Sequence, residues 1–138
     1  MLPLFEQEMS HYSPDDPLTD ALSEMARLRF SQVVVRDRGH SVLLTEEGVS
    51  RWLLSQAAKD VAVGDARIAD VLAHEAKNSS QIMSGRQTVR DGVEAFVASL
   101  ERSEPLQAIL VTPTGKAIEE IAGIVTPWDF VSLAVSAI

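Results

Sequence analysis

The chain has 138 residues, 46% of them hydrophobic and 23% charged, which suffices for one compact core or two small ones packed together. Twenty acidic against twelve basic side chains give a net charge of -8, which opposes broad association with nucleic acid or an anionic membrane. Cysteine is absent, so disulfides, thiolate zinc sites and a cysteine nucleophile are excluded. Neither a basic leader nor an apolar run of roughly 20 residues is visible, and we expect a cytoplasmic protein.

The first part of the chain predicts a helix, a hairpin and a second helix. Apolar residues recur at helical spacing after Asp16, which suits an N-cap, and Pro17, which suits the first helical position. Strands are expected over 30–35 and 41–44, with turn residues between them. Thr45 then caps the second helix.

The same order of elements recurs later in the chain. Thr88-Val89-Arg90-Asp91 has the form of a capping box and starts a helix. Strands are expected over 106–111 and 121–125, and Thr126-Pro127-Trp128-Asp129 caps the last helix. The stripe assigned to the core in the helix after Thr88 consists of Val93, Phe96, Val97 and Leu100.

The repetition predicts two domains. The first, 1–72, includes the N-terminal segment and a short connecting helix over 67–72, preceded by an extended piece from residue 61. The second, 73–138, opens with a brief strand over 81–84. A repeat of about 55 to 65 residues buries too little surface to be stable alone, so we expect the two to pack as a pair.

These segments are similar to a known family. The chain resembles a stand-alone tandem pair of cystathionine-β-synthase (CBS) domains, and the likeness is carried most sharply by residues 88–93, 106–111 and 123–130. The first copy matches more loosely. The resemblance implies an α/β fold, α+β and sandwich-like, in which each repeat runs strand, helix, strand, strand, helix and the two are related by a pseudo-twofold axis.

The resemblance also implies a ligand site at Thr126-x-x-Asp129. In the family such a carboxylate takes the ribose hydroxyls of an adenosine ligand, and the hydroxyl faces phosphate. A carboxylate accepts two hydroxyl hydrogen bonds, and free N–H groups at a helix start favour anions. An ordinary capping box explains the same two residues without a ligand.

Further residues follow from the resemblance. The adenine would be flanked by Gly123 and Ile124 on one strand and by Met83 and Ser84 on another, with simple core packing as the alternative. Gln107 and Ala108 would line the same cleft. A phosphate would be reached by an arginine that is otherwise a solvated surface residue; the candidates are Arg86, Arg90 and Arg51.

The first copy departs from this pattern. Its corresponding tetrapeptide is Thr45-Glu46-Glu47-Gly48, in which Gly48 replaces the ribose-binding acid. Glu46 and Glu47 favour the helix dipole but would repel a phosphate. We therefore expect one competent site, or one modified site, rather than two equal ones.

No catalytic constellation is apparent in the sequence. His74-Glu75-Ala76-Lys77-Asn78 resembles a zinc-protease helix motif, but Asn78 stands where the second histidine is needed. No Ser/His/Asp set or carboxylate pair can be argued either. We expect no enzyme activity, no metal and no required cofactor.

The expected function is a regulatory sensor that binds an adenine-containing ligand between the repeats: AMP, ADP, ATP, S-adenosylmethionine or cyclic di-AMP. The sequence does not choose among them, and an unidentified effector protein would receive the output. A homodimer is expected, because helical faces around Trp52 and Phe130 stay incompletely buried; Trp128 is assigned to core or edge packing. The alternative is a ligand-free interaction module with degenerate clefts.

Overall fold

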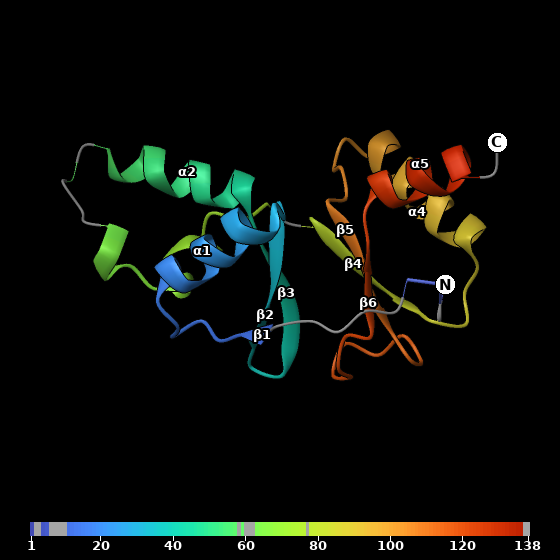
Figure 1. Ribbon diagram of the computed structural model, residues 1–138, viewed down its shortest axis with the longest axis horizontal. Helices are drawn as coiled ribbons and strands as arrows, with labels where there is room; N and C mark the ends of the chain where they lie inside the picture. The colour runs from blue at the N-terminus through green and yellow to red at the C-terminus, as the bar shows by residue number, and fades with distance from the viewer. Residues whose placement is uncertain (2–3, 6–10, 58, 60–62, 77, 137–138) are drawn as a thin grey trace. The chain divides into compact units, whose positions relative to one another are not determined.

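The computed structural model describes residues 1, 4–5, 11–57, 59, 63–76 and 78–136 (Figure 1). The chain divides into two compact units, one of Ser10–Ala76 and the other of Met1–Met9 together with Lys77–Ile138. These bounds differ from the predicted 1–72 and 73–138. The N-terminal part goes with the second unit because Met1 is buried in that unit's core and Phe5 meets Phe130 edge to face.

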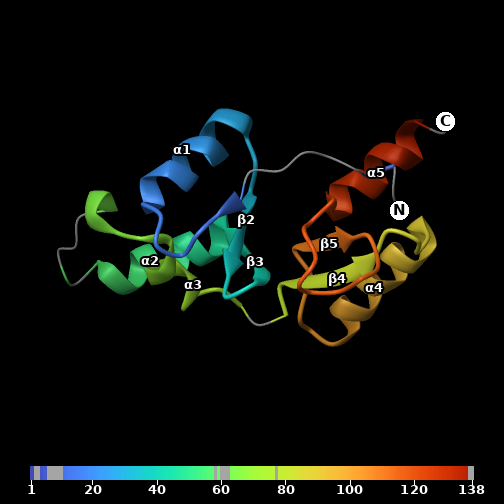
Figure 2. The same cartoon turned by 90° about the horizontal axis from the view of Figure 1, so that it is seen from below.

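The unit Ser10–Ala76 is a three-stranded sheet with its helices on one face (Figures 1 and 2). Strand β2 lies in the middle, parallel to β1 and antiparallel to β3. The elements are β1 (His11–Tyr12), α1 (Leu18–Leu28), β2 (Gln32–Asp37), β3 (His40–Thr45), α2 (Glu46–Gln56), the 3-10 turn η1 (Val63–Asp65) and α3 (Ile68–Leu72). Residues 61 and 62 of the predicted extended piece lie outside the described residues.

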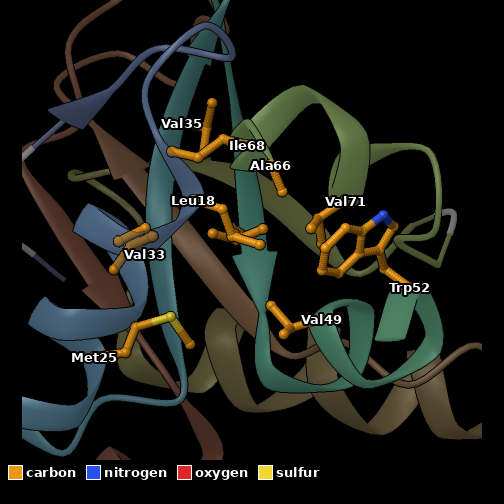
Figure 3. Close-up of a cluster of buried hydrophobic side chains, with 11 residues drawn as sticks. Leu18, Met25, Val33, Val35, Val49, Trp52, Ala66, Ile68 and Val71 are labelled. Carbon is orange, nitrogen blue, oxygen red and sulfur yellow. The ribbon is translucent and has the colours of Figure 1, made fainter. Parts of the chain in front are cut away.

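The core of this unit joins the three α-helices to the sheet (Figure 3). Leu18 of α1, Val35 of β2 and Ile68 of α3 are fully buried. Trp52 of α2 is 3% exposed and lies beside Val71 of α3. Helix α3 thus covers Trp52 itself, whereas the neighbouring Leu53 and Leu54 are exposed, so the face around Trp52 is buried only in part.

The second unit repeats the same topology. Its elements are β4 (Ser80–Ser84), α4 (Val89–Glu101), β5 (Ala108–Thr112), β6 (Gly123–Val125) and α5 (Pro127–Ser136). Strand β5 is central, parallel to β4 and antiparallel to β6. Both units therefore run strand, helix, strand, strand, helix, and the predicted α/β fold is confirmed.

Two local predictions are corrected by the structure. Helix α1 begins at Leu18 with Pro17, not Asp16, at the N-cap position. Asp16 instead accepts a hydrogen bond from the backbone N–H of Ser13 at 2.8 Å. The carboxylate therefore stabilises the turn before the helix, and Pro17 forms an antiparallel bridge with Arg67.

Helix α4 buries a different face from the one predicted. Phe96 packs in the core as expected, but its buried neighbours are Gly92 and Ser99, one helical repeat to either side. Val93, Val97 and Leu100 are exposed, Leu100 by 65%. Both stripes have helical spacing, and the docking of α4 on its sheet decided between them.

Among the helices that the structure describes, none has the length and apolar character that a membrane span needs.

Candidate functional site

The candidate site is built on the junction between β6 and α5. Oδ2 of Asp129 accepts hydrogen bonds from the backbone N–H of Thr126 at 2.7 Å and from its hydroxyl at 3.2 Å. Asp129 N–H in turn donates to the carbonyl of Thr126 at 3.0 Å. Both side chains are half-buried. Within the described part of the chain, these contacts engage only one carboxylate oxygen, which leaves Oδ1 able to accept another donor.

Strand register places Gln107 and Ala108 at the same end of the sheet as this junction. Ile109 pairs with Val125 in an antiparallel register. Thr126, the next residue after Val125, therefore lies opposite Ala108, where β5 begins. The backbone N–H of Gln107 donates to Ser79 at 2.7 Å, which fixes that end of the strand. This end of the sheet therefore combines the hydroxyl, the carboxylate and the start of β5.

The sheet separates the predicted adenine-flanking residues by face. Met83 pairs with Val111, and Val111 pairs with Gly123, so these three positions share one face. That is the core face, where Met83 is buried against Phe96. The Met83 side chain thus has the simple core role that the sequence analysis gave as the alternative.

Ile124 lies on the opposite face of the sheet. It pairs with Leu110, one position away from the Val111–Gly123 pair, and it is half-buried. Ala108 belongs to the same face because it stands two residues before Leu110. Ile124 and Ala108 are therefore on the same side of the second unit's sheet.

Ser84 and Arg86 lie at the other end of the sheet. Ser84 pairs with Thr112, the last residue of β5, four residues along the strand from Ala108. The Ser84 hydroxyl donates to the carbonyl of Pro113 at 3.3 Å and accepts from the N–H of Arg86 at 3.2 Å, so it closes the turn after β4. Four residues of strand span about 13 Å, which separates this group from Thr126.

The candidate arginines differ in their surroundings. Arg86 is exposed. Arg90 pairs with Glu94 at 3.3 Å along α4. Arg51, in the other unit, pairs with Glu47 along α2 and reaches the carbonyl of His74 at 3.4 Å. Arg90 and Arg51 are therefore surface residues with carboxylate partners, in line with the alternative of a solvated surface arginine.

The first unit contains a site residue that sequence reasoning missed. The carboxylate of Glu75 accepts hydrogen bonds from the backbone N–H and the hydroxyl of Thr45, each at 2.7 Å. Burial raises the pKa of the Glu75 carboxyl, against the lowering effect of those bonds. The sequence held one signal for this contact, since the cap at Thr45 has Gly48 where the other two caps have an acid. Glu75 itself stood out only as part of an incomplete zinc motif.

The described residues contain no group of three or more His, Cys, Asp and Glu side chains that could hold a metal ion. His74 and Glu75 do not form a ligand set, since Glu75 is committed to Thr45.

Neither a family model nor a curated protein matches the sequence. Solved structures do match it. A putative signal-transduction protein with CBS domains from Burkholderia ambifaria superposes with a TM-score of 0.69 at 16% identity, covering 95% of this chain and 85% of that one. This chain has the fold of a tandem CBS pair. A CBS domain-containing protein from Kribbella flavida gives a TM-score of 0.65 at 19% identity, covering 94% and 95%.

A third CBS structure adds a ligand. The structure of CBSX2 in complex with AMP matches with a TM-score of 0.62 at 15% identity, covering 94% of this chain and 89% of that one. The CBS fold thus accounts for nearly the whole chain and for the repeated topology of the two units. At these identities the likeness establishes the fold alone.

Proposed function

We propose that the protein is a regulatory ligand-binding module that holds an adenine nucleotide at the start of α5. The observation that carries the proposal is the half-buried Thr126–Asp129 pair, in which the cap uses Oδ2 and leaves Oδ1. A ribose hydroxyl donating to that oxygen would form a charge-assisted hydrogen bond. Ile124 and Gln107 lie half-buried at or next to this end of the sheet and would contact the same ligand, whereas Ala108 beside them is fully buried.

The ligand would extend along the sheet. With the ribose at Asp129, the adenine would lie against Ile124 and toward Ser84, along the face that excludes the Met83 side chain. An elongated nucleotide suits this arrangement, because a smaller ligand bound at Asp129 would not extend to the Ser84 end of the sheet. Arg86 enters the proposal only for a ligand with a phosphate at the Ser84 end.

The ligand panel follows from the fold and from the AMP bound in the CBSX2 structure. We would titrate AMP, ADP, ATP, S-adenosylmethionine and cyclic di-AMP by calorimetry and thermal shift. A ligand at 100 times its dissociation constant stabilises the fold that binds it by about 2.7 kcal/mol. The expected result is one ligand per chain.

The chain offers a matched control for the site. Thr88-Val89-Arg90-Asp91 at the start of α4 has the same bond from threonine N–H to aspartate, at 2.9 Å, although its threonine hydroxyl accepts from Asp91 N–H, whereas the Thr126 hydroxyl donates to the Asp129 carboxylate. Asp129→Asn should weaken nucleotide binding about 10- to 150-fold, the value of a lost charge-assisted bond. Asp91→Asn should cost similar capping energy and leave binding unchanged. Equal effects of the two variants would contradict the site, and circular dichroism would establish that both are folded.

A second candidate function rests on a different observation. The part of the second unit formed by α4 and α5 exposes a set of apolar side chains, here called the α4–α5 surface: Val93, Val97, Leu100, Trp128 and Val131. Exposed apolar groups of this kind mark protein contacts. A homodimer, or contact with an effector protein, would bury them. If no nucleotide binds while the protein still dimerises, the interaction module is the better description.

A further inference from the structure

Among the described residues, a threonine directly precedes α2, α4 and α5, and α4 and α5 have an aspartate three residues after that threonine. Asp91 and Asp129 each return a carboxylate to the backbone N–H of the preceding threonine, at 2.9 and 2.7 Å. Gly48 stands at that position in α2. The threonine half of the cap is intact, since Thr45 Oγ1 accepts from Gly48 N–H at 3.0 Å.

The missing carboxylate comes from 30 residues away. Glu75 Oε1 accepts from the backbone N–H of Thr45 and Oε2 accepts from its hydroxyl, each at 2.7 Å. These are the same two donor groups that Asp129 engages on Thr126. Glu75 therefore occupies the position of the helix's own third-residue acid, and it uses both oxygens where Asp129 uses one.

Gly48 makes room for this carboxylate. A Cβ built on Gly48 would lie 2.0 Å from Oε1 and 2.2 Å from Cδ of Glu75, well inside any normal contact. Any side chain at position 48 therefore displaces the Glu75 carboxylate. Gly48, which the sequence analysis treated as the loss of a ribose-binding acid, is therefore what allows the Glu75 carboxylate to reach Thr45.

Packing of α3 against α2 delivers Glu75 to this place. Val71 lies beside Trp52 in the core (Figure 3). After α3 the chain lies along α2, where Arg51, in the second turn, contacts the carbonyl of His74. The segment that follows α3 is thus tied to α2 by Arg51 and to the N-cap residue Thr45 by Glu75.

We propose that Glu75 is a built-in occupant of the start of α2, which closes the first repeat to a nucleotide. The inference rests on the proposed function in naming the kind of ligand that is excluded. Thr45 is 3% exposed, and its hydroxyl is used as donor and as acceptor, whereas Thr126 is half-buried. A carboxylate at Thr45 also repels a phosphate that would approach the same N–H group.

The contact between Glu75 and Thr45 is tested by the change in stability that Gly48→Ala causes in the parent and in a Glu75→Ala chain. In the parent, Gly48→Ala should push the Glu75 carboxylate away and lower the folding equilibrium constant about 5- to 150-fold, the effect of leaving a buried donor unpaired. In a Glu75→Ala chain, where that bond is already lost, Gly48→Ala should be neutral or stabilising because alanine favours a helix over glycine. An equal effect in both backgrounds overturns the proposal.

The readout and the control use the chain's own residues. The chain has two tryptophans, so Trp128→Phe leaves Trp52, in the core of the first unit, as the sole tryptophan; excited apart from Tyr12, it reports urea unfolding. Glu46→Gln removes an exposed acid from the same helix start. Gly48→Ala should be as destabilising in that background as in the parent. If Glu75→Ala does not fold, Glu75→Ser replaces it, since that side chain is also too short to reach Thr45 and the space beside Gly48.

Calorimetry with AMP separates closure from the proposed function. We expect one AMP per parent chain, and this binding should be lost or weakened in Asp129→Asn. It should be retained in Glu75→Ala, where the opened start of α2 still has Gly48 in place of an acid that could bind a ribose. Two AMP per parent chain, or binding that survives Asp129→Asn and is lost in Glu75→Ala, overturns closure and makes Glu75 a ligand residue. If the parent binds no AMP, the proposed function fails for this ligand, and the two-background comparison still decides whether Glu75 occupies the α2 start.

Discussion

The ring of Phe130 on α5 meets the ring of Phe96 on α4 edge to face, with centroids 5.6 Å apart and planes at 76°. Phe130 immediately follows Asp129, so this contact holds the start of α5 against the buried face of α4. Gly92 allows this approach, because a Cβ added at this position would lie only 3.0 Å from the Phe130 ring. The position of the candidate carboxylate thus depends on an aromatic pair in the core.

Phe130→Leu should destabilise the second unit by about 1 kcal/mol, the value of an aromatic pair beyond its buried area. Nucleotide affinity should fall with it, since the start of α5 loses its anchor. Glu101→Ala, an exposed substitution at the last residue of α4, serves as control and should change neither quantity. Urea unfolding and calorimetry would measure both effects, and an unchanged midpoint for Phe130→Leu would refute the anchoring role.

Ser99→Ala should cost about 1 to 3 kcal/mol. The buried Ser99 hydroxyl donates to the carbonyl of Phe96 at 2.7 Å and accepts from the N–H of Leu106 at 3.0 Å. Alanine leaves that N–H buried and unpaired. Chemical denaturation is the measurement, with Ser50→Ala on the exposed side of α2 as a control expected within about 0.5 kcal/mol of the parent. A neutral Ser99→Ala would show that water replaces the hydroxyl.

Glu75 should make the stability of the first unit fall as pH rises above 4.5, the ordinary pKa of glutamate. Burial raises the folded-state pKa, so the folded chain binds this proton more tightly than the unfolded chain, and stability declines as the proton is lost. Arg51 opposes this shift and Glu47 adds to it. Glu75→Gln should flatten the decline in unfolding experiments followed by Trp52 fluorescence.

The control for this pH experiment has the opposite sign. Hydrogen bonds from Lys116 and Thr114 lower the pKa of Glu119 to about 2. Its contribution to stability is therefore gained between about pH 2 and 4.5, below the Glu75 window. Glu119→Gln should leave the decline above pH 4.5 intact. A decline that persists in Glu75→Gln would assign it to another group.

Leu100→Glu should shift the protein from dimer to monomer in light scattering. Leu100 is 65% exposed and Trp128 is 71% exposed, so a charge on the α4–α5 surface would face the partner's apolar side chains. Ile118→Glu introduces the same charge at an exposed loop position and should leave the dimer unchanged. A parent that stays monomeric across a wide concentration range would refute the dimer.

The order of elements was readable from the sequence because its signals are local. Thr45, Thr88 and Thr126 each start a helix where the capping pattern predicts one. Such caps depend on residues three apart, and hairpins depend on a few turn residues, so neither needs knowledge of the rest of the chain. The repeated strand–helix–strand–strand–helix order followed from these signals.

Choices between equally spaced alternatives required the tertiary structure. The stripe of Val93, Val97 and Leu100 has the same period as the buried stripe of Gly92, Phe96 and Ser99, and periodicity alone does not say which stripe meets the sheet. Trp52 and Trp128 differ in the same way. Trp52 is 3% exposed because α3 covers it, whereas Trp128 is 71% exposed.

The starts of α2 and α5 show most clearly which contacts could be predicted from the sequence and which required the tertiary structure. The contact between Asp129 and Thr126 was predictable from sequence, because the two residues are three apart, as in a capping box. Glu75 was missed because 30 residues separate it from Thr45, and only the docking of α3 on α2 brings its carboxylate to that N–H. Local hydrogen bonding is fixed by spacing along the chain, whereas a contact between distant residues exists only once the core has packed.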